Sequence, residues 1–78
     1  MNKLKLKEYT LEYVVYFYQP EGQGIFGEII YRFNNEPETL KKAEYDEFGR
    51  YGFKAGCKVK ELVNDKKYLP LEIIQAWY

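Results

Sequence analysis

The residues in this chain with the most recognisable chemistry are three glycines, Gly22, Gly24 and Gly27, spaced as G-x-G-x-x-G. That spacing occurs in loops that hold phosphates, because glycine lets the backbone approach the ligand closely. In dinucleotide-binding folds the last glycine opens a helix whose N-terminus holds the pyrophosphate. Here β-branched and aromatic residues on both sides predict two strands, so the spacing does not indicate a dinucleotide site.

The stretch 22–29 instead resembles the glycine-rich hairpin of protein kinases, including Phe26 before the third glycine and an aliphatic residue two positions after it. The resemblance covers eight residues. A kinase also needs a strand lysine, a catalytic loop and an Asp-Phe-Gly motif. The chain has no His, so it has no His-Arg-Asp motif, and Glu47-Phe48-Gly49 is not Asp-Phe-Gly. We therefore interpret the glycines as a hairpin turn, with a β-bulge expected at Gly27.

Other groups that could catalyse a reaction lack the partners they need. A catalytic thiol usually relies on a histidine base, and Cys57 is the one cysteine in a chain without His. Glu36 with Glu38, and Asp46 with Glu47, fit turn and helix-start charges better than an acid–base pair across a cleft. The common zinc-ligand sets cannot be built either. We expect no catalytic residue, no metal and no cofactor, and a protein that is not an enzyme.

Length and charge limit the class of protein. The 78 residues predict a single domain over 1–78. Lys and Arg number 12 and Asp and Glu number 12, and this zero net charge argues against both a non-specific nucleic-acid binder and a polyanionic mimic of DNA. No apolar run approaches the ~20 residues of a membrane span, so we expect no membrane partner. A lone Cys without a secretion signal predicts a cytoplasmic location.

The pattern over residues 46–65 predicts one long amphipathic helix. At a period of 3.6, the apolar stripe of this helix contains Phe48, Tyr51, Gly52, Ala55, Val59, Leu62 and Val63. Asp46 is the expected N-cap. Each glycine inside the helix costs about 1 kcal/mol relative to Ala, so we expect the glycines to permit close approach to bulky neighbours.

The first half of the chain predicts strands. Residues 9–19 are β-branched and aromatic and predict a central strand, and residues 25–33 predict a second strand that forms an antiparallel hairpin with the first. Residues 1–7 are expected to be a frayed lead-in or a sheet edge.

The remaining segments have two interpretations each. Residues 39–45 favour a short third strand over a helix. Residues 73–78 suit a buried strand that joins the sheet, with Trp77 under the helix, and the alternative is a short helix that starts at Pro70. The predicted fold class is α+β: a small antiparallel sheet of three or four strands (β-β-β-α-β) with one amphipathic helix packed on one face.

Aromatic residues make up 19% of the chain, and they suggest a function. If the helix covers one face of the sheet, the other face or its margins expose a candidate interaction surface of Tyr16, Tyr18, Phe26 and Tyr31. Such rings bind a protein partner, stack bases, or simply fill a core. We expect a non-enzymatic protein-interaction module that uses this Tyr-rich face or a sheet edge, with another protein or a second copy in a homodimer as partner. The alternative is single-stranded nucleic-acid binding on the aromatic face, which the neutral net charge disfavours.

Overall fold

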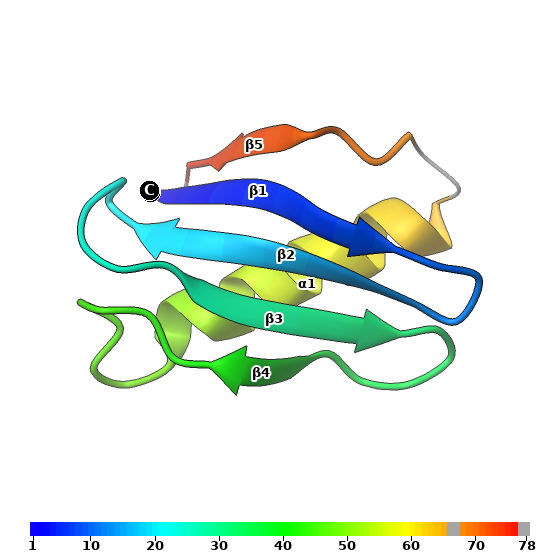
Figure 1. Ribbon diagram of the computed structural model, residues 1–78, viewed down its shortest axis with the longest axis horizontal. Helices are drawn as coiled ribbons and strands as arrows, with labels where there is room; N and C mark the ends of the chain where they lie inside the picture. The colour runs from blue at the N-terminus through cyan, green and yellow to red at the C-terminus, as the bar shows by residue number, and fades with distance from the viewer. Residues whose placement is uncertain (66–67, 77–78) are drawn as a thin grey trace.

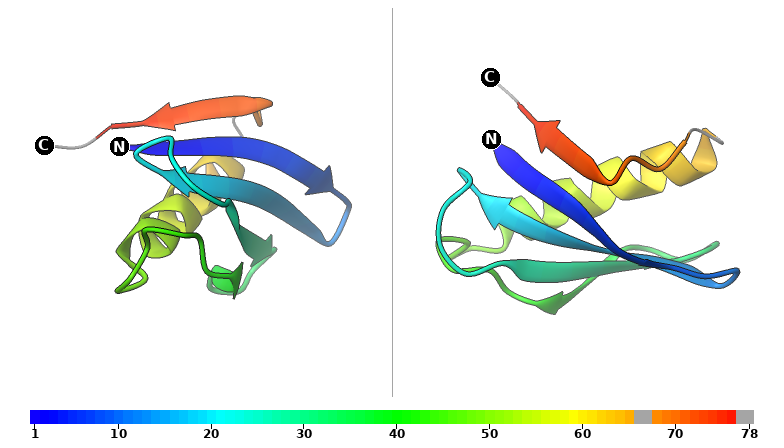
Figure 2. Two further views of the ribbon diagram at one scale, coloured as in Figure 1. Left: turned by 60° about the vertical axis from the view of Figure 1, so that its left-hand side comes forward. Right: turned by 45° about the horizontal axis from the view of Figure 1, so that its top comes forward.

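The protein is a small α+β domain in which one helix lies across a five-stranded antiparallel sheet (Figures 1 and 2). The computed structural model describes residues 1–65 and 68–76. Their elements are β1 (Asn2–Tyr9), β2 (Tyr13–Pro20), β3 (Gly27–Arg32), β4 (Glu38–Lys41), α1 (Arg50–Asn64) and β5 (Glu72–Gln75). The strand order is β4-β3-β2-β1-β5. The predicted fold class is confirmed, with five strands in place of three or four.

The additional strand is β1, where a frayed lead-in was the first expectation. β1 pairs with β2 on one side and with β5 on the other, so it is neither frayed nor an edge. Asn2 and Leu4 are fully buried beneath α1, while Lys3 and Lys5 alternate with them on the opposite face. The strand forms because every second side chain is buried and the lysines between them keep their charges in water.

The predicted hairpin of β2 and β3 is confirmed, and its turn depends on left-handed backbone. Glu21, Gly22 and Gly24 have φ of 53°, 67° and 80°. Gly27 lies in β3, where an added Cβ would be 2.4 Å from the ring of Tyr18. The β2–β3 register is regular through Gly27, so the bulge expected there is wrong; the register shift lies in the β3–β4 pairing, where Leu40 of β4 is the extra residue.

The two segments with two interpretations, residues 39–45 and residues 73–78, both contribute to strands. β4 covers the first part of residues 39–45, and β5 forms where a helix from Pro70 was the alternative. β5 is an edge strand with Ile74 60% exposed, so the prediction of a buried strand is wrong. Trp77, expected under the helix, lies outside the described residues.

Helix α1 begins four residues later than the pattern predicts. Its N-cap is Gly49, with φ 74°, and Phe48 precedes the helix and is 79% exposed, so its place in the apolar stripe is wrong. The buried residues of α1 are Gly52, Ala55, Gly56, Val59 and Leu62. They pack on a core from β1, β2 and β3 that contains Leu4, Val14, Tyr16, Tyr18, Ile29 and Tyr31.

The late start has a physical cause in the buried side chain of Asp46. Its Oδ1 accepts the N–H of Tyr51 at 3.0 Å, and its Oδ2 accepts the N–H of Gly52 at 3.0 Å. Asp46 therefore satisfies two of the free N–H groups of the first turn although it is not the N-cap residue. The same Oδ2 accepts the hydroxyl of Tyr18 at 2.6 Å, and that hydroxyl accepts the N–H of Ala43 at 3.0 Å.

Removal of the Tyr18 hydroxyl tests this network. Tyr18→Phe should lower the free energy of unfolding by about 2 to 3 kcal/mol, because it leaves the buried N–H of Ala43 unsatisfied and takes one donor from a carboxylate. Urea unfolding followed by circular dichroism measures the loss. Tyr13→Phe is the matched control, since that hydroxyl donates to the exposed Glu8 and its removal should change stability far less. Equal losses in the two variants would contradict the assigned role.

The buried tyrosines also predict an alkaline limit to stability. Burial, with a smaller contribution from Tyr68, raises the pKa of Tyr16 from 10.0 to about 12. Burial and the bond to Asp46 also raise the pKa of Tyr18. Above pH 10 the unfolded chain loses these protons before the folded chain does, so the contribution of these two tyrosines to stability should be constant below pH 10 and fall between about pH 10 and 12. Urea unfolding at stepped pH measures the free energy of unfolding across this range. Tyr16→Phe should lose less stability between about pH 10 and 12 than the wild type; an unchanged pH profile in this variant would contradict the role assigned to Tyr16.

Candidate functional site

The structure separates the four residues of the expected interaction surface. Tyr16, Tyr18 and Tyr31 are at most 2% exposed and lie beneath α1, so their predicted place on an exposed face is wrong. Both faces of β2 are apolar, and its pattern alone cannot show which one the helix covers. The glycine-bearing side of α1 lies close enough to the sheet to pack on the large rings. Phe26 alone lies on the other side, with its ring 5.9 Å from that of Phe17.

A groove with a volume of about 560 Å³ lies between the edge of the sheet and α1. We call it the β4 groove. One wall is the segment 36–39, which includes the first residues of β4, and the other is the flank of α1 from residue 49 to residue 65. On the helix wall Gly49, Phe53, Cys57 and Glu61 follow one another at intervals of four, so they share one flank of the helix.

Two helix glycines set the width of this groove. An added Cβ at Gly56 would lie 2.7 Å from Cβ of Pro37, and one at Gly52 would lie 2.9 Å from Oγ1 of Thr39 and 3.0 Å from the hydroxyl of Tyr18. The expectation that the glycines permit close approach is confirmed for these two positions. Phe53 also lines the groove, and its side chain is 71% exposed.

The strand wall of the groove is at the edge of the sheet. β4 pairs with β3 on one side, and within residues 1–65 and 68–76 no strand lies on its other side. All four of its residues are exposed. An edge strand presents N–H and C=O groups that can pair with a further strand. A segment placed there would also cover Phe53 and Cys57.

Ion pairs cross and flank the groove. Lys60 of α1 lies 2.9 Å from Glu36, which precedes β4, and this contact raises the pKa of Lys60. Glu38 pairs with Arg32, and Glu61 pairs with Lys58 at 3.8 Å. The carboxylate side chains of these pairs are 54% to 83% exposed, so each pair contributes little to stability and can rearrange around a ligand.

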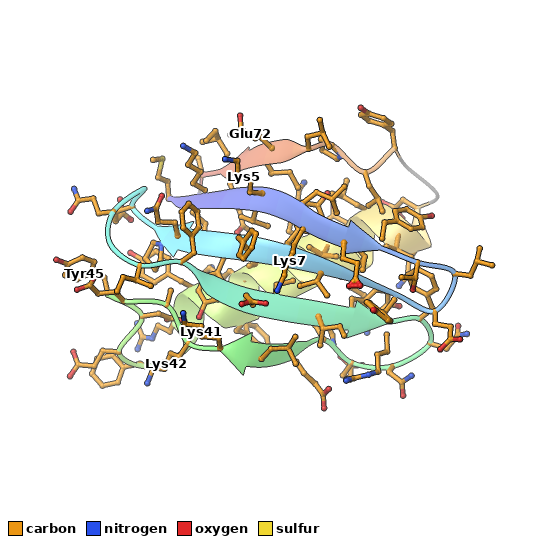
Figure 3. The ribbon with its side chains drawn as sticks, viewed as in Figure 1. Lys5, Lys7, Lys41, Lys42, Tyr45 and Glu72 are labelled. Carbon is orange, nitrogen blue, oxygen red and sulfur yellow. The ribbon has the colours of Figure 1, made fainter. Side chains whose placement is uncertain are left out.

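The face of the sheet away from α1, which we call the open face, carries charged residues over a small apolar layer (Figure 3). Lys7 lies 2.6 Å from Glu28 and above the ring of Phe17, 5.3 Å from its centroid. Val15 and Ile30 are 5% exposed on the same side. Because Lys7 covers Phe17, this ring is not an open platform for a base.

The glycine-rich loop packs against the chain itself. The N–H of Ile25 donates to Oε1 of Glu44 at 2.9 Å, and the amide of Gln19 donates to the C=O of Gly24 at 2.7 Å. An added Cβ at Gly24 would be 2.7 Å from that same glutamate oxygen. The glycines therefore serve the turn and its contact with residues 44–45.

No family model matches the chain, and neither does any curated protein or solved structure. Among the described residues, no group of three or more His, Cys, Asp or Glu side chains could hold a metal ion. In the same part of the chain, no helix has the length and apolar character needed to cross a membrane. The function of the protein is therefore inferred from the geometry of the β4 groove and of the open face.

No pattern in the sequence marked the residues of the β4 groove as a common site. Phe53 and Cys57 belong to neither the apolar stripe nor the charged residues of the predicted helix. The sequence does contain a weak indication of the groove. Phe53 and Cys57 are two apolar residues four positions apart, so they lie on the same side of α1 and form a second, smaller apolar flank. Recognition of the groove also required the position of β4, which no local pattern contains.

If Phe53 belongs to an open groove, its removal should not harm the fold. Phe53→Ala and Phe48→Ala should each change the free energy of unfolding by less than about 0.5 kcal/mol, since both rings are mostly exposed. Ile29→Ala, at a buried position, should cost about 2 to 5 kcal/mol. Urea unfolding of the three variants measures the difference. A large loss for Phe53→Ala would show that the ring belongs to the core.

Proposed function

We propose that this protein is a non-enzymatic interaction module that binds an extended segment of a partner protein as an additional strand along β4. The observation that carries the proposal is the shared groove, in which an edge strand with unpaired backbone lies beside a helix flank with an exposed phenylalanine. Backbone pairing supplies affinity in such complexes, and alternate side chains supply specificity.

The dimensions of the site suit a short segment. β4 has four residues, which span about 13 Å. Alternate side chains of a paired segment would point toward α1, where Phe53 and Cys57 offer apolar contact. The others would lie beside Leu40, which is 52% exposed on the open face. An interface of this size belongs to the small, transient class.

The charges at the rim favour particular partners. Glu36, Glu38 and Glu61 are more than half exposed and line the groove, while Lys60 is the one lysine among its lining residues. Carboxylates at a rim attract complementary cations and increase the rate of association. We therefore expect an apolar segment flanked by Lys or Arg, supplied by another protein or by a second copy of this chain.

Peptide selection tests the proposal directly. Peptides selected from a displayed random library should bind the wild-type protein and shift the amide resonances of β4 in NMR spectra. Phe53→Ala should weaken that binding at least about tenfold, because a buried aromatic contact is a typical hot spot. Phe48→Ala is the matched control, since Phe48 is equally exposed but does not line the groove, and it should change affinity less than about twofold.

Cys57 gives an independent measurement at the same site. It is the one cysteine of the chain, it is exposed, and it lines the groove. Saturating peptide should slow its alkylation by iodoacetamide several-fold, and β4 resonances should shift with the same concentration dependence. Peptides that bind Phe53→Ala normally and leave the alkylation rate unchanged would refute the proposed site.

A further inference from the structure

Lysines gather at one end of the open face, where Glu28 and Glu72 are the carboxylates of the same row of paired residues. Lys3 and Lys5 lie on β1, Lys41 ends β4, and Lys42 follows it. None of these four side chains forms an ion pair with another described residue. Figure 3 shows Lys5, Lys41 and Lys42 in the same half of this face, with Lys7 near its middle and Glu72 beside Lys5.

Strand pairing sets the spacing of these lysines. Lys5 pairs with Glu72 on one side and with Phe17 on the other, Phe17 pairs with Glu28, and Glu28 pairs with Lys41, so these residues form one row across the sheet. Neighbouring strands are about 4.8 Å apart, which places the backbones of Lys5 and Lys41 about 14 Å apart. Glu28 is already bound to Lys7, so Glu72 is the carboxylate of the row that remains beside Lys5. Lys3, Lys5, Lys41 and Lys42 outnumber that carboxylate, so positive charge is in excess here although the whole chain is neutral.

An exposed ring lies next to this charge. Tyr45 is 64% exposed and adopts a left-handed backbone with φ 67°, which is rare for a bulky residue. The close packing of one ring edge on Gly24 holds it in place, since an added Cβ at Gly24 would be 2.7 Å from its Cε2. Figure 3 shows it beyond Lys41 and Lys42 at the margin of the same face.

We infer that this end of the open face binds single-stranded nucleic acid through Lys5, Lys41, Lys42 and Tyr45. Lysines that follow a phosphate backbone beside an exposed ring are the usual arrangement for single strands, because every base offers a face for stacking. An acidic peptide would use the lysines but not the ring. A duplex would use the phosphates but offers no unpaired base. The surface is separate from the β4 groove, so the two proposals stand or fall independently.

Fluorescence anisotropy with a labelled oligothymidylate measures the binding. The wild type should bind at 20 mM NaCl and weaken at 200 mM, with a slope of log K against log salt of about −2, since three lysines release about 0.7 counterion each from a single strand. The double variant Lys41→Gln with Lys42→Gln should bind at least about fivefold more weakly, and its slope should be smaller by about 1.4. Arg50→Gln with Lys58→Gln, the same loss of charge on α1, should leave affinity within about twofold.

The contribution of the ring is tested separately. Tyr45→Ala should weaken binding about tenfold, in the range for loss of one stacked base. Tyr68→Ala, at a tyrosine that is 81% exposed before β5, is the matched control and should change little. Circular dichroism confirms that each variant is folded before binding is measured.

Four results would overturn the inference. They are no binding at 20 mM NaCl, equal binding of a duplex of the same length, equal competition by polyglutamate, and a Tyr45→Ala variant that binds like the wild type. Equal competition by polyglutamate would assign the lysines to an acidic protein partner instead. The inference would be supported if the protein prefers the single strand to the duplex, and if affinity falls in the Lys41/Lys42 and Tyr45 variants but in neither control variant.

Discussion

The architecture depends on one buried carboxylate, that of Asp46. Its two oxygens accept three hydrogen bonds, two from the first turn of α1 and one from Tyr18 in the middle of the sheet. The Tyr18 hydroxyl in turn holds the backbone of Ala43. These bonds join the helix start, strand β2 and the connection after β4. The negative charge also suits the positive end of the helix dipole. The start of the helix wall of the β4 groove, at Gly49, is placed by the same contacts.

Buried tyrosines stabilise this small domain, whose core would otherwise be too small to hold it together. The chain has one Cys and no His, so neither a disulfide within it nor a common zinc site can hold it together. Rings fill the space under α1, while their hydroxyls reach other segments: Tyr16 donates to the C=O of Pro70 and Tyr31 to Asn64. A ring with a polar tip can both bury area and link elements. Three of the tyrosines, Tyr16, Tyr18 and Tyr31, thus belong to the core, whereas Tyr9, Tyr45 and Tyr68 are exposed.

Two surfaces remain exposed, the edge of the sheet at β4 and the open face. Both follow from the packing of the single helix α1 on one face of the sheet. The short strand β4 leaves the edge of the sheet unpaired beside α1, and a single helix covers only one face of the sheet. Exposed edges promote aggregation unless something limits them. Here β4 is short and has charged residues at both ends, which suits a site that pairs with a short segment rather than with a long sheet.

Local pattern alone predicted the hairpin of β2 and β3 and the single amphipathic helix, and it favoured a strand over a helix in residues 39–45 and 73–78, hence the α+β class. These depend on periodicity and turn chemistry, which act over a few residues. The alternation of lysine with Asn2, Leu4 and Leu6 also marked β1, but its charges made it resemble a solvated end. Tertiary structure decided which face of β2 lies under the helix, because both faces are apolar and only the position of α1 distinguishes them. Tertiary structure also decided the β4 groove, since Phe53 and the first residues of β4 line it together only after α1 packs on the sheet. It likewise placed Lys5 and Lys41 in one row, since they belong to strands that are distant in sequence.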